Sequence, residues 1–575
     1  MAKQPGTASE SGKRAAPRPP VAARAAAPKA APRTPAPRAK ANSKAARQVV
    51  IVVHGMGEQR PMDTIRDFAR TAWEDDPAIM RPHDRPAASE TAADSAIDAA
   101  SESPRETMWN RPDPRLGSLE LRKLTTRASL PSPAFPNGVA TDFVELYWAD
   151  LTEGATMRGV LSWLRMLLFR RPSRAPSSVL PHYLFFWAIL LSAGAVIGAV
   201  LLHRWGWIAV APPYAALMER ATALFVLLSG VILLLGRYAE NMLVARIGRV
   251  ARYTQARPEN IGARAATRER GLALLRALHA DPAVDRIILV GHSLGAILAY
   301  DLLTYYWAEL DAPRRLDGAA ADGPAKRKFD AYRALEEARA ALIAAAEAGA
   351  AAGPYDAALT RWRTAQAAFR RTLADAPPQR GGDGLPAPEG RWLISDFLTL
   401  GAPLAHAEFL LARDREDLMT RQAGRELPTN PPKAEPLDKD DARAAARLGL
   451  PPHIMSYWSD RSQGARGWRL HHASPFAAVR WTNIYDAPPG LFLWGDFVSG
   501  PVGRKRERGE TVDLFGAGVR DLALKRDSGE RGWRATLRAG LFTHSRYWTR
   551  TSPKARLALF RRALDLLDKD EPGAG

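Results

Sequence analysis

The chain has 575 residues, enough for several domains or for one elaborated α/β domain with insertions. It contains no cysteine, which excludes disulfide bonds, thiolate catalysis and cysteine metal sites. Its formal net charge of +20 would suit a nucleic-acid binder, but residues 1–48 carry 11 Lys or Arg against the single acid Glu10 and so supply half of that charge. The rest is spread over the remainder of the chain, so the charge gives no ground to expect a nucleic-acid partner.

Residues 1–48 form a basic tail rich in alanine and proline. Such low-complexity sequence has too few apolar side chains to build a core, so we expect disorder or an extended polyproline conformation. A solvated tail is the first interpretation, and attraction to an anionic membrane surface is the alternative. No apolar segment follows the basic residues, so the tail lacks the pattern of a cleaved targeting peptide.

Residues 49–180 are interpreted as the first part of an α/β domain. The β-branched run at residues 51–53 ends at His54 and Gly55, which is typical of a strand that enters a tight turn. This turn could bind a phosphate, present backbone amides to an oxyanion, or be a plain turn. The absence of a G-K-[ST] motif after Gly57 argues against the phosphate. The same part of the chain is predicted to contain a loop at residues 85–114 and a further strand within residues 141–151.

Residues 181–238 are interpreted as a transmembrane helical hairpin. The 20-residue run at 183–202 has no charged side chain and is long enough to cross a bilayer as a helix, and the run at 221–236 has 16 residues. Arginines are more frequent outside the two runs than between them, so the positive-inside rule places the rest of the chain on the cytoplasmic side of a membrane, such as an inner membrane. The alternative is a pair of buried core helices.

Residues 239–310 contain the motif that carries the chemistry. A short apolar strand at residues 286–290 is followed by Gly291-His292-Ser293-Leu294-Gly295, which fits G-x-S-x-G, and then by an amphipathic helix. A strand, a crowded glycine-bounded turn and a helix whose N-terminal dipole faces the serine are what a nucleophile elbow requires. A plain strand-to-helix turn with a capping serine is the alternative. In this context the chain resembles the α/β-hydrolases, in particular their lipase-like and esterase-like branch.

Two segments follow the elbow before the next motif. Residues 311–390 are predicted to be an Ala-rich helical insertion, with a helical hairpin at about 326–376 that is broken at Gly353-Pro354. This insertion could be a lid, a partner surface or a passive addition. Residues 391–575 are interpreted as the rest of the hydrolase domain. Their first strand, within residues 392–406, ends in G-A-P-L and is similar to the strand and turn that follow the elbow in many lipase-like members.

The resemblance implies that an acid and then a histidine follow Ser293 along the chain. A strand at residues 480–485 leads to Asp486 and Asp496; the resemblance to the family's acid loop favours Asp496, with Asp486 as the alternative. His544 precedes a final amphipathic helix, where the family places its base. Other histidines are less well placed: His471 and His472 precede both acids, His406 belongs to the G-A-P-L turn, and the His292 side chain is expected to turn away from the nucleophile.

The resemblance thus implies a triad in which Ser293 is the nucleophile, His544 the general base and then acid, and Asp496 the group that orients the histidine. The loop His54-Gly55-Met56-Gly57 resembles the family's H-G-x-G loop. The backbone amides of Met56 and Leu294 are therefore the expected oxyanion donors. Gly291 and Gly295 are expected to tolerate the crowding of the elbow.

Together these features predict an α/β-hydrolase fold, a mostly parallel sheet flanked by helices, with a transmembrane hairpin and a helical insertion. The expected function is that of a membrane-anchored serine hydrolase that cleaves carboxylic esters, with lipid esters among the candidates. Its partners would be membrane lipids and an ester or lipid substrate, and no metal or organic cofactor is expected. The alternative is a catalytically silent scaffold on a hydrolase fold that binds a protein partner at a membrane.

Overall fold

A computed structural model gives the fold. The residues it describes are 45–55, 60–76, 78–79, 107–152, 169, 180–209, 211, 214, 216–217, 220, 253–254, 258–316, 322–349, 352–374, 390–459, 467–486, 496, 498–507, 510–524, 543–549 and 552–569. The basic tail, apart from residues 45–48, lies outside these ranges, as does the predicted second span at 221–236.

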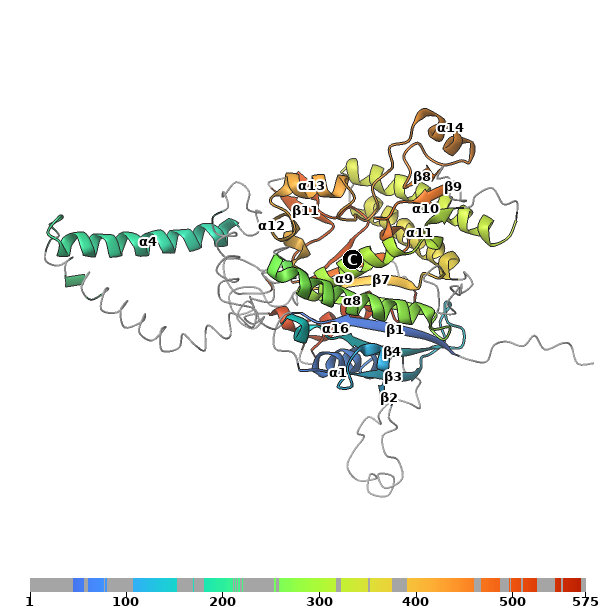
Figure 1. Ribbon diagram of the computed structural model, residues 1–575, viewed down its shortest axis with the longest axis horizontal. Helices are drawn as coiled ribbons and strands as arrows, with labels where there is room; N and C mark the ends of the chain where they lie inside the picture. Colours follow the sequence, from blue (N-terminus) through green and yellow to red (C-terminus); the bar gives the residue numbers. More distant parts are fainter. Residues whose placement is uncertain are drawn as a thin grey trace, which may run out of the picture. The chain divides into compact units, whose positions relative to one another are not determined.

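Eight strands form one sheet in the order β13-β10-β7-β5-β1-β4-β3-β2 (Figure 1). The six strands from β13 to β4 run parallel, and β3 and β2 extend the β4 edge as antiparallel neighbours. A mostly parallel sheet covered by helices makes this an α/β protein. The strands are β1 (Ala46–Val53), β2 (Met108–Pro112), β3 (Arg122–Ala128), β4 (Val139–Leu146), β5 (Arg286–His292), β7 (Ile394–Leu400), β10 (Arg480–Tyr485) and β13 (Arg520–Ala523).

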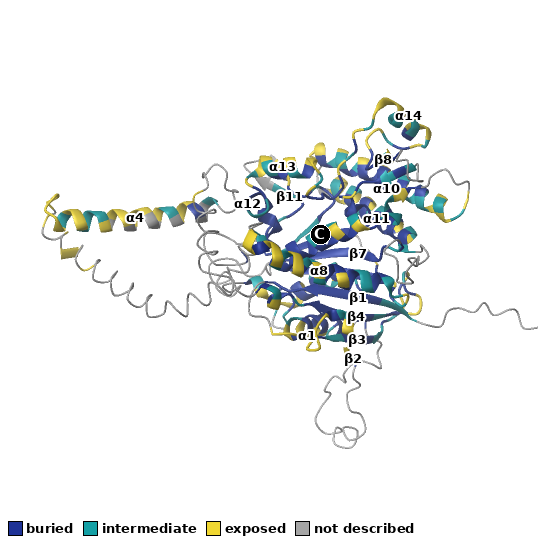
Figure 2. Cartoon of the chain, viewed as in Figure 1, coloured by how far each residue is buried: buried dark blue, intermediate teal, exposed yellow. Residues whose placement is uncertain are grey.

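The central strands are buried on both faces, as Figure 2 shows by their dark colour. Every residue of β5 and of β7 is buried, and so are the last six residues of β1. Continuous apolar runs such as Val49–Val53 suit this environment, because a parallel strand between two helical layers has no solvent face. The strands predicted near residues 51, 141, 286, 392 and 480 are therefore confirmed as strands of the sheet.

Helices cover the two faces of the sheet. Phe143 of β4 contacts Phe68, which in turn packs edge-on against Phe560. Leu146 is three residues further along β4, so its side chain points to the opposite face of the sheet, where it lies against Gly271. The first face is covered by α1 (Asp63–Ala69), the π-helical turn η1 (Arg70–Glu74) and α16 (Lys554–Leu564), and the second by α8 (Pro258–Ala280), which packs on α9 (Leu294–Glu309).

The Ala-rich insertion forms two helices that belong to the core. They are α10 (Pro324–Glu347) and α11 (Ala352–Ala374). The predicted break at Gly353-Pro354 is wrong by a few residues, because these two residues lie in the first turn of α11, where a proline has no hydrogen bond to lose. Trp362 is fully buried, and Gln366 Nε2 donates to the carbonyl oxygens of Phe476 (2.6 Å) and Val479 (3.0 Å). The insertion is thus a packed layer of the fold.

The predicted first span lies within the helix α4 (Leu180–Arg204). Within the described part of the chain, no helix combines the length and the apolar character that a membrane crossing requires.

The predicted loop at 85–114 is wrong at its end, because β2 pairs there with β3. Its residues 85–106 lie outside the described residues. Four of the five β2 side chains are exposed, so this edge strand has no apolar periodicity that could reveal it in the sequence. The remaining elements are short. They are the 3₁₀ turns η3 (Pro114–Leu116), η4 (Ala149–Thr152), η7 (Ala312–Arg314), η8 (Pro403–His406), η9 (Pro475–Ala477) and η10 (Thr543–Ser545); the helices α12 (Ala407–Leu410), α13 (Arg415–Ala423) and α14 (Lys439–Arg447); the sheet β6-β9-β8 (Arg315–Leu316, Gly467–Leu470, Ser456–Ser459); and the pair β11-β12 (Arg504–Glu507, Glu510–Asp513).

Candidate active site

Ser293 occupies a strained turn between β5 and α9. Its backbone angles are φ 53° and ψ −131°, a region that residues with a side chain seldom adopt. The two glycines of the motif have no room for a side chain. A Cβ on Gly291 would lie 2.4 Å from Ala296 Cα, and one on Gly295 would lie 2.2 Å from the Val53 carbonyl oxygen. The pattern G-x-S-x-G is therefore a steric requirement of this turn.

The loop after β1 lies directly against Ser293. Val53 and Gly291 are partners in the parallel register, so the next residues of both strands leave the sheet side by side. A Cβ on Gly55 would lie 2.7 Å from Ser293 Cβ, so only glycine allows this approach. The loop predicted to carry an oxyanion donor is thus at the serine.

His54 anchors this loop. The Trp148 backbone N–H donates to His54 Nε2 (3.2 Å), His54 Nδ1 donates to the Gly55 carbonyl (2.8 Å), and the Trp148 indole is stacked on the imidazole. Leu294 is the first residue of α9, and its N–H belongs to the helix-terminal amides that lack an intrahelical acceptor. Met56 and Gly57, the other predicted parts of the oxyanion loop, lie outside the described residues.

Asp496 and His544 form a hydrogen-bonded pair. His544 Nδ1 donates to Asp496 Oδ2 (2.9 Å), and the Tyr547 hydroxyl donates to the same oxygen (2.6 Å). The Val498 backbone N–H donates to Oδ1 (3.0 Å). Burial opposes ionisation of Asp496, but the hydrogen bond and charge of His544, with the bonds from Tyr547 and Val498, lower its pKa below the ordinary value. The aspartate is therefore charged and holds Nδ1 as the donor, which leaves Nε2 of His544 to accept a proton.

The Asp496–His544 pair lies beside the serine turn. The Ser293 N–H donates to the carbonyl of Leu400 (3.0 Å), and the next residue, Gly401, has φ 59°. A Cβ on Gly401 would lie 2.9 Å from Asp496 Oδ2 and 3.2 Å from His544 Nδ1. Ser293 Oγ and His544 Nε2 are both buried, and neither has a hydrogen-bond partner among the described residues. The fold therefore brings the three predicted triad residues to the same end of β5 and β7.

His292 lies against the histidine of the predicted triad, a contact that the sequence did not predict. Its Nε2 donates to the backbone carbonyl of His544 (2.8 Å), and its ring lies 5.1 Å from the His544 ring and 4.8 Å from Trp548. Burial, followed by the nearby His544, lowers the pKa of His292 to about 3, so it stays neutral. Nothing in the sequence reveals this contact, because the two histidines are 252 positions apart.

The alternative acid, Asp486, has another partner. Its carboxylate pairs with Arg556 (Oδ2 to Nη1, 3.3 Å), and its carbonyl accepts the backbone N–H of Asp496 (3.1 Å). Asp486 thus supports the loop that carries Asp496. Two of the competing histidines lie in other surroundings. His406 is buried in η8, and the ring of His471 contacts the carbonyl of Lys433 (3.2 Å).

Glu145 is a buried acid near the site that sequence reasoning missed. It lies on β4, is 1% exposed, and its Oε2 accepts the Met62 N–H (2.9 Å) at the start of α1. Burial raises the pKa of Glu145 to about 7, with a further rise from Asp63 and an opposing effect of the Met62 bond. Its only signal in the sequence is an acid inside the apolar strand around residues 143–146.

The site contains the parts of an acyl-transfer centre: a serine on a strained turn, a histidine beside it and a buried carboxylate that orients the histidine. No family model, curated protein or solved structure matches the chain. Within the described ranges, no group of three or more His, Asp or Glu side chains could hold a metal ion. The expected lack of a cofactor stays a prediction.

Proposed function

We propose that this chain is a serine hydrolase with an α/β-hydrolase fold that cleaves carboxylic esters. The observation that carries the proposal is the convergence of Ser293 and the Asp496–His544 pair around Leu400 and Gly401. The buried Ser293 hydroxyl has no hydrogen-bond partner within the described ranges. Strain at a serine persists only where the surrounding structure enforces it, and here two glycines and two strands do so.

The proposed reaction uses two steps. Ser293 Oγ attacks the ester carbonyl carbon while His544 Nε2 takes the serine proton, and the resulting oxyanion is held by backbone N–H groups that include Leu294. His544 then gives that proton to the leaving alcohol, and the acyl group remains on Ser293. A water molecule then attacks the acyl carbon while His544 Nε2 takes its proton. The bond from the acyl carbon to Ser293 Oγ breaks, His544 returns the proton to Oγ, and the acid is released. Asp496 stays ionised and stabilises the imidazolium in both steps.

The direct test is covalent labelling with a fluorophosphonate probe. We expect the folded wild-type chain to be labelled, Ser293→Ala to lose all labelling, and Ser118→Ala, which changes an exposed serine, to be labelled like the wild type. Absence of labelling on a well-folded wild type would refute the proposal. That result would favour the alternative, a catalytically silent scaffold that binds a protein partner.

We also propose that the chain is attached to a membrane through residues 183–202, with the hydrolase domain on the cytoplasmic side and lipid esters as candidate substrates. The support is the uncharged sequence of this segment, and apolar side chains of α4 such as Leu184, Leu191 and Ile197 are exposed. The expected result is that the protein stays with the membrane pellet after alkaline carbonate extraction, and that activity rises with acyl-chain length. Release into the supernatant would contradict the attachment.

A further inference from the structure

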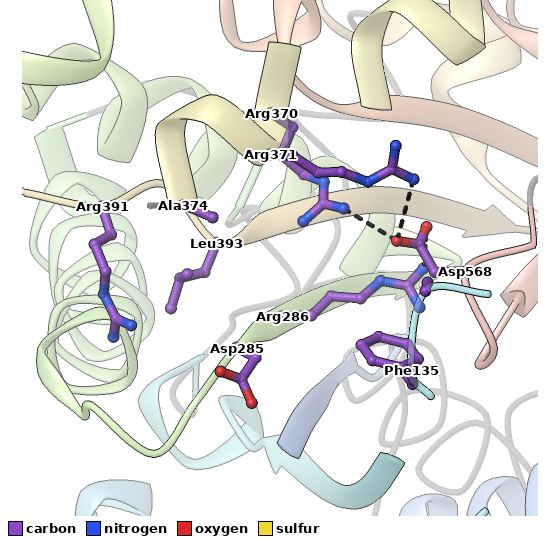
Figure 3. A pocket seen from close by; sticks show the side chains of 10 residues that line it. Phe135, Asp285, Arg286, Arg370, Arg371, Ala374, Arg391, Leu393 and Asp568 are labelled. Carbon is purple, nitrogen blue, oxygen red and sulfur yellow. Dashed lines mark hydrogen bonds and ion pairs between the residues drawn. The ribbon is translucent and has the colours of Figure 1, made fainter. Parts of the chain in front are cut away.

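Figure 3 shows a cavity of about 230 Å³. It lies at the end of β5 that is opposite to Ser293. Arg286, which lines it, is the first residue of β5, whereas Ser293 follows the last one. Seven residues of strand separate the two sites by about 23 Å. The cavity is lined by Ala134, Phe135, Asp285, Arg286, Arg370, Arg371, Ala374, Arg391, Leu393 and Asp568.

The charge in this cavity is dominated by arginines that share one carboxylate. Arg370 Nη2 and Arg371 Nη2, both from α11, point to the same Asp568 oxygen at 3.1 and 3.9 Å, as the dashed lines in Figure 3 show. The other oxygen of Asp568 lies 2.7 Å from Arg480 Nη2 and 3.6 Å from Arg286 Nη2. The Asp568 carboxylate is therefore shared by four guanidinium groups.

Two of these four arginines have a second carboxylate. Arg286 Nη2 and Arg480 Nε each donate to Asp396, at 2.7 and 2.8 Å, and Arg480 Nη2 also lies 3.5 Å from Asp565 Oδ2. Arg370 differs, because among the described residues Asp568 is its one ion-pair partner. Burial, together with the positive charges of Arg286 and Arg480, lowers the pKa of Arg370 to about 10 although Asp568 raises it. The charge of Arg370 is thus incompletely compensated, and a second anion would stabilise it.

Arg391 adds a further positive charge to the cavity, from outside helix α11. Arg391 precedes β7, and its Nη2 donates to the carbonyls of His279 (3.1 Å) and Asp281 (2.9 Å), so no carboxylate of the described chain neutralises it. The second acid of the lining, Asp285, is exposed, and its Oδ2 accepts the backbone N–H of Arg47 (2.9 Å). Among the residues that line the cavity, four arginines therefore face two aspartates, so the lining has a net positive charge.

The remaining wall is apolar and small. Phe135, Leu393 and Ala374 face the same space as the arginines. The planar guanidinium fork matches the oxygens of a phosphate group better than any other cationic side chain. A volume of about 230 Å³ leaves room for a phosphate with a short organic group beside it.

We propose that this cavity binds a small organic phosphate, whose phosphate group is held by Arg370 and Arg371 and whose organic part contacts Phe135 and Leu393. Asp568 positions the two arginines. The site is independent of the proposed hydrolase chemistry, since none of its residues contacts Ser293, Asp496 or His544 in the described structure.

The test is isothermal titration of the purified full-length chain with phenyl phosphate and with inorganic phosphate, at constant ionic strength. We expect both to bind, and phenyl phosphate to bind at least about tenfold more tightly because its ring contacts the apolar wall. Arg371→Gln should weaken both by about tenfold or more. This side chain is 55% exposed, so its replacement leaves the core intact. Arg361→Gln, an exposed position on the same helix, is the matched control and should leave binding unchanged.

A second variant, Arg370→Lys, keeps a positive charge next to Asp568 but removes the planar fork, and it should also weaken phosphate binding. If the folded wild type binds neither compound at a ligand concentration of about 10 mM, the arginines are only a structural ion-pair network and the proposal is wrong. It is equally wrong if Arg371→Gln and Arg370→Lys both bind like the wild type.

Discussion

The assignment of Asp496 as the orienting acid leads to a sharp prediction for Asp496→Asn. In the native site Oδ2 accepts from His544 Nδ1 and from the Tyr547 hydroxyl, and Oδ1 accepts from the Val498 backbone N–H. An asparagine must place its NH₂ group at one of these positions. A backbone N–H cannot become an acceptor, whereas an imidazole and a hydroxyl can. The NH₂ will therefore occupy the Oδ2 position and donate to His544 Nδ1.

This arrangement moves the His544 proton to Nε2, which can then no longer accept the proton of Ser293. The expected loss in kcat is about 10⁴-fold, equivalent to about 5.5 kcal/mol of transition-state stabilisation, with little change in KM. The assay is hydrolysis of a p-nitrophenyl ester, with circular dichroism to confirm folding.

The matched control is Asp486→Asn. Its carboxylate faces Arg556 at 3.3 Å, so the variant should lose about 1 to 3 kcal/mol of stability but keep kcat within a few-fold. A folded Asp496→Asn that keeps near-normal turnover, or an Asp486→Asn that loses as much as we expect for Asp496→Asn, would show that the acid has been assigned to the wrong residue.

Three further outcomes are expected. The pKa of Glu145 in the folded chain, about 7, is above its unfolded value, so the stabilising contribution of this group is full below about pH 4.5 and is lost as the pH rises through 7. Glu145→Gln should therefore be about 2 to 3 kcal/mol more stable than the wild type at pH 8 and nearly equal to it at pH 4.5 in urea unfolding. An equal difference at both pH values would rule out the titration of Glu145. Gly295→Ala should destabilise the chain by about 3 kcal/mol or more, because its Cβ would clash with the Val53 carbonyl. The control Gly262→Ala, where an added Cβ meets no atom within 4 Å, should stabilise helix α8 by about 0.5 to 1 kcal/mol. Thermal melts that rank the two variants in the opposite order would contradict the geometry of the turn. His292→Phe keeps an aromatic ring against Trp548 but loses the hydrogen bond to His544, so kcat should fall about tenfold with KM unchanged; a change confined to KM would mean that His292 acts on substrate binding instead.

Local patterns in the sequence were sufficient for the elbow and for most of the sheet. Apolar β-branched runs and glycines report on the backbone within a few residues, so β5, β7 and β10 and the turn at Ser293 could be predicted. The same reasoning missed β2, whose exposed side chains give no period, and placed the break of the helical hairpin a few residues too late. A proline in the first turn of a helix has the same local appearance as one that ends a helix.

Only the tertiary structure decided which side chains meet. Asp486 and Asp496 both follow β10, but Asp486 contacts Arg556 and Asp496 contacts His544. Both partners are distant from the aspartates along the chain. The roles of His292 and Tyr547 and the arginine cluster around Asp568 depend in the same way on contacts across strands and layers. Hydrogen bonds and ion pairs act over a few ångströms in space, whereas sequence periodicity reports only which face of an element is buried. The sequence by itself therefore determined most of the elements and the candidate triad residues, and the packing of the elements determined the partner of each side chain.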